Sequence, residues 1–250
     1  MVSFIMKQTR LIVFDWAGTL IDHGSRAPVE TFVELFRIRG IQIGEAVAKG
    51  PMGLGKRDHI KTILSNLSVS EAWKNTFGED PTDKDVDAIY GEYESIQIET
   101  IKKHSKVIHG AVDVVSFFRH QGIKVFGTTG YPRKVAEKVW QLAADQGLEL
   151  DGNVCNCDVR VGRPSPFMLF RAMELANVYP SDNVLKVGDT VPDVLEAKHA
   201  GALAVSVLTT GTDWTGEVCR NRLKEQFISA GALDAIDSIA DLPIWFKLRN

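Results

Sequence analysis

The stretch TRLIVFDWAG at residues 9–18 decides the fold. It is a short run of apolar, mostly branched side chains that ends in Asp15 and continues into Ala17-Gly18, which is typical of a buried strand leading into a loop. From Gly122 onward, similar apolar runs such as IKVFGTTG alternate with helical patterns such as PRKVAEKVWQLAADQG. This order predicts an α/β fold, a Rossmann-like doubly wound parallel sheet with helices on both faces.

A different kind of segment lies between the first strand and this series. Four stretches place apolar residues at helical spacing, namely APVETFVELFRIRG, KRDHIKTILSNL, SEAWKNTFG and DKDVDAIYGEYESIQIETIKK. We therefore predict an all-helical cap domain at residues 24–105, inserted into a Rossmann-like core domain formed by residues 1–23 and 106–250.

Composition narrows the class of protein. Of 250 residues, 44% are hydrophobic and 24% are charged, and the net charge of -3 gives no reason to expect a nucleic acid or an anionic membrane as partner. Three cysteines cannot form a disulfide framework, and Cys155-x-Cys157 has no second pair to complete a zinc site. With no apolar run of membrane-spanning length and no signal peptide pattern, we expect a soluble, cytoplasmic protein.

Polar groups follow the predicted strands at the carboxyl edge of the sheet, where ligands bind in open parallel sheets. They are Asp15, Thr128-Thr129-Gly130, Arg163, Gly188-Asp189-Thr190 and Asp193. Taken singly, each carboxylate has the alternative interpretation of a turn or helix cap, and Arg163 that of a surface cation. Together they suit a divalent cation that holds a phosphoryl group.

The segment GPMGLGKR at residues 50–57 nearly matches a nucleotide phosphate loop, G-x-x-x-x-G-K-[ST]. Arg57 replaces the Ser or Thr that would bind magnesium, Pro51 removes a backbone N–H, and the preceding GEAVAKG predicts a helix rather than a strand. These departures disfavour a nucleotide site. Lys56 is then either a solvated lysine at the start of a helix or a group with another task.

Over nearly its whole length the chain resembles the phosphonatase family of the haloacid dehalogenase superfamily. The resemblance rests on DWAGT, APVETF, PMGLGKRDH, TTGY and GRPSPFM. It implies hydrolysis of the P–C bond of phosphonoacetaldehyde to acetaldehyde and phosphate. Ser25 and Ser165 depart from the residues usual in the family, which affects the fine fit of the substrate.

Ala17 and Lys56 form a consistent pair under this resemblance. Ordinary phosphatases of the superfamily carry a second Asp at the position of Ala17, because an alkoxide leaving group needs a proton. Cleavage of a P–C bond needs an electron sink instead, and a lysine amine supplies one by condensing with the aldehyde to give an iminium ion. Lys56 is the candidate amine, and His59, three residues later on the same helical face, is the candidate proton relay.

The resemblance also implies the remaining roles. Asp15 would be the nucleophile that forms an aspartyl-phosphate, and Thr129 and Arg163 would bind the phosphoryl oxygens. The implied Mg²⁺ ligands are Asp15, the carbonyl of Ala17, Asp189 and Asp193. The implied substrate-binding residues are Trp16 and Gly130, through their backbone N–H groups, and Met52, Gly53 and Tyr131. The family forms homodimers, so we expect one here.

Three alternative functions stay open at this point. The first is a conventional phosphatase or phosphomutase of the same superfamily, which the absence of an acid at Ala17 disfavours. The second is a binding or regulatory module with an inactive core, which the presence of Asp15, Thr129, Arg163 and Asp189 disfavours. The third is an NTPase, against which the departures in GPMGLGKR count.

Overall fold

The structure is a computed structural model that describes residues 9–52 and 54–249. Six strands form one sheet in the order β3-β2-β1-β4-β5-β6, and every neighbouring pair is parallel. The strands are β1 (Leu11–Asp15), β2 (Lys124–Thr129), β3 (Gly152–Cys155), β4 (Val184–Gly188), β5 (Leu203–Val207) and β6 (Asp234–Ile236). The chain builds outward from β1 on one side and then on the other, so the crevice at the carboxyl end of β1 is a switch point of the topology.

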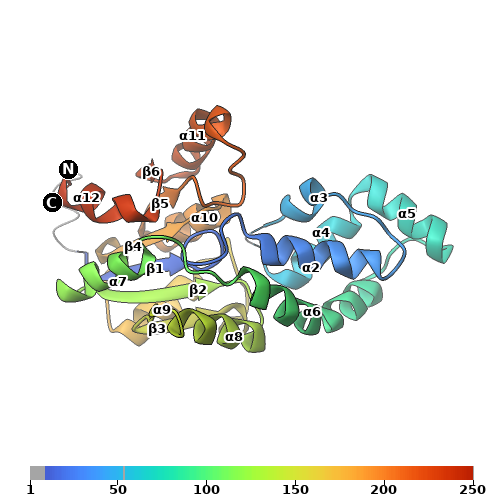
Figure 1. Ribbon diagram of the computed structural model, residues 1–250, viewed down its shortest axis with the longest axis horizontal. Helices are drawn as coiled ribbons and strands as arrows, with labels where there is room; N and C mark the ends of the chain where they lie inside the picture. Colours follow the sequence, from blue (N-terminus) through green and yellow to red (C-terminus); the bar gives the residue numbers. More distant parts are fainter. Residues whose placement is uncertain (1–8, 53, 250) are drawn as a thin grey trace.

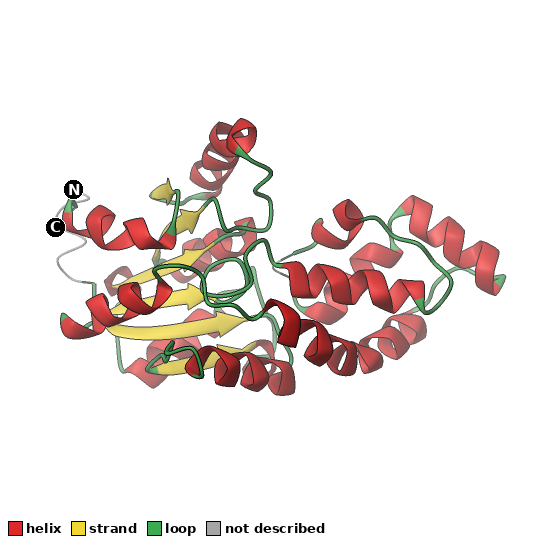
Figure 2. Ribbon diagram, viewed as in Figure 1, coloured by secondary structure: helices red, strands yellow, loops and turns green. Residues whose placement is uncertain are grey.

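Helices cover both faces of the sheet (Figures 1 and 2). Ile12 and Phe14 of β1 face one apolar cluster, whereas Leu11 and Val13 face another, as the period of two in a strand requires. The first cluster is completed by α7 (Ala111–His120), α8 (Arg133–Ala144) and α12 (Leu242–Lys247). The second is completed by α9 (Phe167–Ala176), α10 (Val191–Ala200) and α11 (Arg220–Ala230). The predicted doubly wound α/β fold is confirmed.

Five further helices lie beyond the carboxyl end of the sheet, on the right of Figure 1. They are α2 (Arg26–Arg37), α3 (Glu45–Lys49), α4 (Lys56–Leu64), α5 (Leu67–Phe77) and α6 (Asp83–His104). They surround an apolar cluster of their own, centred on Phe32, Ile60, Ile89 and Tyr93. The predicted helical character of this region is therefore correct, while its division from the core at residues 24 and 105 stays a prediction.

Some elements were not foreseen from the sequence. The strand β6 is only three residues long and contains Asp234, so it has too little periodicity to be recognised. It becomes a strand because it pairs with β5, Val205 opposite Asp234 and Val207 opposite Ile236. The helices α7 and α12 were also unassigned. Short 3₁₀ turns complete the chain at Asn156–Asp158, Ser181–Asn183, Glu217–Cys219 and Ile239–Asp241.

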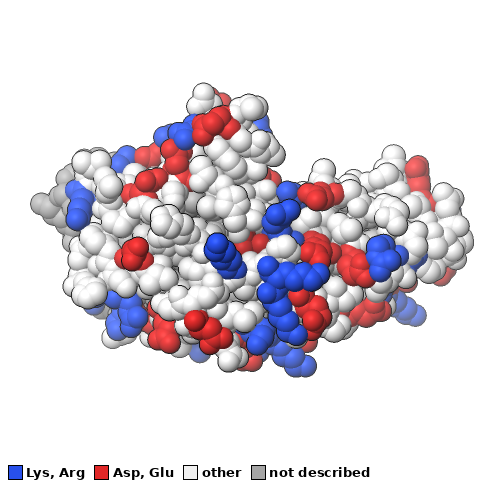
Figure 3. Space-filling view, in the orientation of Figure 1, with Lys and Arg blue, Asp and Glu red and all other residues white. Residues whose placement is uncertain are grey.

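The surface fits the moderate net charge. On the face shown in Figure 3, acidic and basic side chains are interspersed. Within residues 9–52 and 54–249, no helix has both the length and the apolar character needed to cross a membrane. All three cysteines are free, with Cys155 and Cys219 buried and Cys157 exposed.

Candidate active site

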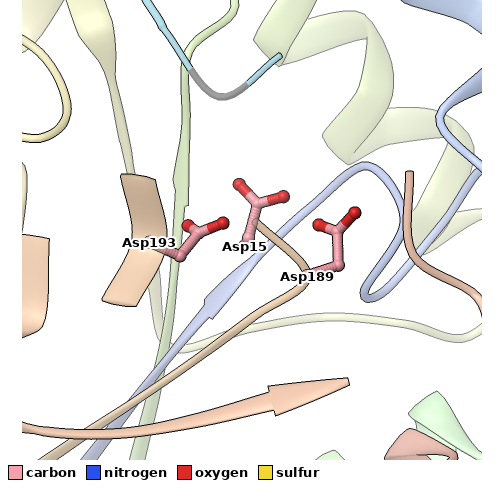
Figure 4. A group of neighbouring side chains, drawn as sticks. All are labelled: Asp15, Asp189 and Asp193. Atoms are coloured by element: carbon pink, nitrogen blue, oxygen red, sulfur yellow. The ribbon is translucent and has the colours of Figure 1, made fainter. Parts of the chain in front are cut away.

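Three buried carboxylates meet at the carboxyl end of β1. Asp15 ends β1, Asp189 directly follows β4, and Asp193 lies in the first turn of α10. One oxygen from each lies within 4.8 Å of the others, and Figure 4 shows Asp15 between the other two. The predicted gathering of these side chains is thus present in the structure, because β1 and β4 are adjacent parallel strands.

Asp193 is already balanced by protein groups. It closes a capping box at the start of α10, where its Oδ2 accepts hydrogen bonds from the amide and hydroxyl of Thr190. Its Oδ1 lies 3.1 Å from Arg163 Nη1 and 3.1 Å from Lys186 Nζ. Burial acts against the charged form, but these two cations lower the pKa of Asp193 below its usual value.

Asp15 and Asp189 are less completely balanced. Burial raises the pKa of Asp15, opposed by Arg163. Burial also raises the pKa of Asp189 well above its usual value, and the neighbouring Asp15 and Asp193 add to the shift. Two adjacent carboxylates that resist ionisation fit a site for a divalent cation with a preference for hard oxygen ligands. Ala17, whose carbonyl was predicted to join them, lines the same pocket.

Arg163 is held on all sides. Its Nη1 lies 2.7 Å from Asp15 Oδ1, its Nε donates a hydrogen bond to Glu196 Oε2 at 3.2 Å, and its Nη2 donates to Thr128 at 2.8 and 2.9 Å. These acceptors raise the pKa of Arg163 in spite of burial, so it stays charged. Each nitrogen of the guanidinium therefore has a protein partner, and the partner of Nη1 is Asp15, the nucleophile candidate.

Lys186, Glu196 and Thr128 belong to this network, and of these Lys186 and Glu196 were missed from the sequence. Lys186 and Glu196 are fully buried, with their charged atoms 3.4 Å apart, and Lys186 Nζ donates a hydrogen bond to Thr128 Oγ1 at 2.6 Å. A signal was available for two of them. A lysine inside the apolar run VLKVG and a glutamate one helical turn after Asp193 are charges at positions predicted to be buried.

The predicted amine lies on the opposite wall of the same pocket. Lys56 begins α4, and its side chain is buried together with Asp15, Thr129 and Tyr131 around the cavity. Its Nζ lies 5.3 Å from the centre of the Tyr131 ring and 5.8 Å from that of Phe32. Among the described residues it makes no ion pair and no hydrogen bond. Burial therefore lowers the pKa of Lys56 to about 8, although Asp15 acts in the other direction.

His59 packs behind Lys56 rather than against the pocket. Its ring stacks on Phe32 with centroids 3.8 Å apart, and its Nε2 lies 2.8 Å from the carbonyl oxygen of Ala48. That contact makes Nε2 the protonated nitrogen and leaves Nδ1 as an acceptor without a partner among the described residues. Burial and the charge of Lys56 lower the pKa of His59 to about 3, so the ring is neutral near pH 7.

The remaining predicted residues fall into three groups. Thr129, Gly130, Tyr131 and Met52 line the pocket. The side chain of Trp16 points into the core, where its Nε1 donates to Asn153, and the substrate contact of its backbone N–H stays a prediction. Gly53 lies outside the described residues. Gly130 is needed for the close approach of the helical region, because a Cβ there would lie 3.2 Å from the carbonyl oxygen of Leu54.

The cavity of this pocket is small. It has a volume of about 30 Å³, which is room for about two or three water molecules. Its walls come from both parts of the molecule, with Asp15 and Arg163 on one side and Met52 and Lys56 on the other.

Comparison with known proteins identifies the family. The model of the haloacid dehalogenase-like hydrolases matches residues 9–201. A phosphonoacetaldehyde hydrolase of Syntrophobacter fumaroxidans is 36% identical over 94% of this chain and 89% of its own length. Another, from Pseudomonas fluorescens SBW25, is 40% identical over 93% and 89%. The chain belongs to the phosphonoacetaldehyde hydrolase family of the haloacid dehalogenase-like hydrolases.

A solved structure agrees with this assignment. The crystal structure of a phosphonoacetaldehyde hydrolase-like protein from Oleispira antarctica superposes with a TM-score of 0.93, at 32% identity, over 97% of this chain and 92% of that one. This member of the family is thus an enzyme, a hydrolase built on a parallel sheet with an adjoining helical region. The carboxylates at the end of its β1 lie where hydrolases of this fold class gather their reacting groups.

Proposed function

We propose that this protein hydrolyses the P–C bond of phosphonoacetaldehyde to acetaldehyde and phosphate. One observation carries the proposal: a buried lysine amine with no ion pair or hydrogen bond to the described residues shares a small pocket with Asp15, while Ala17 stands where an acid would protonate an alkoxide. The names of the relatives support it. A conventional phosphatase would have no use for Lys56 and would lack its acid.

The first half of the reaction uses Lys56. The neutral amine attacks the aldehyde carbon, and loss of water leaves a protonated imine that links Nζ to the substrate. A carboxylate oxygen of Asp15 then attacks phosphorus in line. As the P–C bond breaks, its electron pair moves into the iminium and gives a neutral enamine on Lys56, and the phosphoryl group becomes an aspartyl-phosphate.

The second half restores both residues. Protonation of the terminal enamine carbon regenerates an imine, and water releases acetaldehyde from Lys56. A second water hydrolyses the aspartyl-phosphate to phosphate and free Asp15. The net reaction consumes one water, because the water released on imine formation offsets one of the two that are added.

The surroundings of Lys56 suit its part. With a pKa of about 8, an appreciable fraction of the amine is neutral near pH 7, as nucleophilic attack requires. Neutral His59 behind it offers Nδ1 as a proton acceptor. Burial keeps the hydroxyl of Tyr131 protonated by raising its pKa well above the usual value, so that this hydroxyl can donate a hydrogen bond to a substrate oxygen.

The opposite wall handles the phosphoryl group. Arg163 orients Asp15 and favours its charged form, and in the bound state it shares Nη1 with a phosphoryl oxygen. Thr129 and the amide of Gly130 offer further donors. A divalent cation, Mg²⁺ in this proposal, would be held by Asp15, Asp189 and the carbonyl of Ala17, with Asp193 supporting them. It would supply positive charge for the phosphoryl oxygens.

The helical region 24–105 acts in this proposal as a cap domain that opens to admit substrate and closes to bring Lys56 over Asp15. Two chain segments join it to the core, at residues 22–25 and 105–108, and Asp22 N donates to Lys106 O between them. Assembly as a homodimer stays a prediction.

Reduction of the imine tests this function directly. Incubation with phosphonoacetaldehyde and borohydride should inactivate the enzyme and add a two-carbon or phosphonoethyl group to Lys56, read by peptide mass spectrometry. Lys56→Arg should abolish both adduct and turnover. Lys61→Arg is the matched control, since Lys61 lies on the same helix but pairs with Asp83 at the surface.

Two results would contradict the proposal. Turnover of phosphonoacetaldehyde by Lys56→Arg at the wild-type rate would exclude the imine. Hydrolysis of simple phosphate esters faster than phosphonoacetaldehyde would favour a conventional phosphatase.

A further inference from the structure

A threonine-rich loop after β5 reaches the metal-site candidate Asp189. Thr212 donates two hydrogen bonds to Asp189 Oδ2, from its amide at 2.7 Å and from its hydroxyl at 2.8 Å. Gly211 allows this approach, because a Cβ at that position would lie 3.0 Å from Asp189 Cβ. Thr212 is itself buried. The loop therefore fixes one oxygen of Asp189.

The same hydroxyl continues to the helical region. Thr212 Oγ1 lies 2.8 Å from the hydroxyl oxygen of Ser25, the residue that precedes α2. The Thr212 hydroxyl therefore lies within hydrogen-bond distance of both Asp189 Oδ2 and the Ser25 hydroxyl. The result is a chain of hydrogen bonds that links Ser25 through Thr212 to Asp189.

The segment that carries Ser25 has an unusual backbone. Asp22, Gly24 and Ser25 all have positive φ, at 54°, 78° and 49°, a conformation that is costly for the two non-glycine residues. Surrounding bonds hold it in place. The carbonyl of Thr210 accepts from the amide of Gly24 at 2.9 Å, and the hydroxyl of Thr210 donates to the carbonyl of Gly18 at 2.7 Å.

The loop 210–212 thus contacts three things at once: the turn after the nucleophile candidate, the first connection to the helical region, and the carboxylate of Asp189. Ser25 was noted from the sequence only as a departure from the family pattern. In the structure it is the end of a hydrogen-bond chain, for which an oxygen is a much better donor than a sulfur.

We propose that Ser25 and Thr212 are positioning residues that couple the cation site at Asp189 to the hinge of the cap. This inference rests on the proposed function for the role of Asp189. Asp189 is held at Oδ2 by Thr212 and at Oδ1 by the hydroxyl of Thr19, 3.4 Å away, so its carboxyl group has a fixed orientation for a cation. Because coupling is reciprocal, cation binding that fixes Asp189 also stabilises the closed arrangement of residues 22–25.

The test compares Mg²⁺ binding without substrate in four proteins. Thr212→Val removes the hydroxyl and keeps the amide bond to Asp189, whereas Thr212→Ser keeps both. Thr209→Val is the matched control, because Thr209 lies in the same loop but its hydroxyl bonds the carbonyl of Asp237. By calorimetry, Thr212→Val should weaken Mg²⁺ about tenfold, Thr212→Ser should restore most of the affinity, and Thr209→Val should match the wild type.

Hydrogen exchange over residues 20–30 gives a second readout that a merely structural role would not move. In the wild type, Mg²⁺ should slow exchange in this segment. In Thr212→Val and Ser25→Ala, Mg²⁺ at saturating concentration should slow it much less, while Ser25→Cys should fall between Ser25→Ala and the wild type. The comparison with and without Mg²⁺ is made within each variant, so general loosening of the fold cancels.

The outcomes separate this inference from the function on which it rests. If the wild type binds Mg²⁺ but Thr212→Val has the affinity and the Mg²⁺-dependent exchange of Thr209→Val, the coupling is wrong while the proposed reaction stands. If the wild type binds no Mg²⁺, both the coupling and the metal of the proposed function are overturned. Imine trapping on Lys56 is independent of either result.

Discussion

The two walls of the pocket differ in how their buried charged groups are paired. On the sheet side, Arg163 and Lys186 are surrounded by the carboxylates of Asp15, Asp193 and Glu196. On the helical side, Lys56 is also buried, lies near the rings of Phe32 and Tyr131, and makes no ion pair among the described residues. Ion pairing lowers the pKa of Asp193 and raises that of Arg163, whereas burial without an ion pair among the described residues lowers the pKa of Lys56. Burial alone therefore does not decide the protonation state; the neighbours do.

Imine formation on Lys56 and phosphoryl transfer to Asp15 should be separable by mutation. The largest loss of activity should follow replacement of Asp15. Asp15→Asn should reduce phosphate release by at least about 10⁴-fold, because the amide cannot take up the phosphoryl group. It should still form an adduct on Lys56, since the aldehyde meets the amine first. Phosphate release and borohydride trapping measure the two steps. Asp145→Asn, at an exposed position, is the control, and loss of the adduct in Asp15→Asn would show that the two walls do not act independently.

Breaking the ion-pair network should cost both stability and rate. Glu196→Gln keeps the shape of the side chain but removes a charge that Arg163 and Lys186 share at 3.2 and 3.4 Å. We expect a loss of about 3 kcal/mol in the free energy of unfolding, as for one partner of a buried pair, and a fall in kcat of about 10- to 100-fold as Arg163 loses its orientation. Urea unfolding and steady-state kinetics measure these. The exposed Glu225→Gln should change neither, and a Glu196→Gln enzyme with wild-type stability would refute the balanced-network account.

The dependence of kcat/KM on pH should follow the ionisation of Lys56. Because the amine must be neutral and its pKa is about 8, kcat/KM should rise about tenfold per pH unit below that value and level off above it. The rate falls at low pH because protonation converts the Lys56 amine to an ammonium group, which cannot attack the aldehyde. Rates between pH 6.5 and 9 measure the midpoint. A profile that is flat down to pH 6.5 would mean that Lys56 is neutral throughout or that imine formation does not limit the reaction.

The smallest expected effect is on stability: replacing Lys56 should increase the free energy of unfolding, whereas Glu196→Gln should decrease it. A lysine whose pKa falls from 10.5 to about 8 on folding destabilises the protein at pH values below 8. That cost disappears as the pH rises toward 10.5, where the amine is neutral in both states. Lys56→Met should thus stabilise the protein at pH 7 by about 1–3 kcal/mol while abolishing the adduct, and the gain should shrink near pH 10. Urea unfolding at both pH values tests this, and a destabilised Lys56→Met would count against an unpaired amine.

Much of the core site could be predicted from the sequence because it depends on strand ends. Asp15, Thr129 and Asp189 follow apolar runs that had to be buried strands, and parallel strands bring their carboxyl ends to one edge. This prediction does not depend on the order of the strands in the sheet. In contrast, the roles of Ser25 and Thr212 carry no signal in the chain, because single hydroxyls in loops are common and these two residues are 187 positions apart.

By itself, the sequence determined the fold class, the helical region and the chemical groups available, because hydrophobic periodicity and residue type are local properties. Through the family resemblance, it assigned Lys56 and Asp15 to one mechanism but did not give their relative positions. Only the tertiary structure decided which charges are paired and which are not. That depends on how far each side chain reaches across the pocket and on what buries it, and these two facts set the pKa of Lys56, the restraint on Arg163 and the hydrogen bonds that hold Asp189.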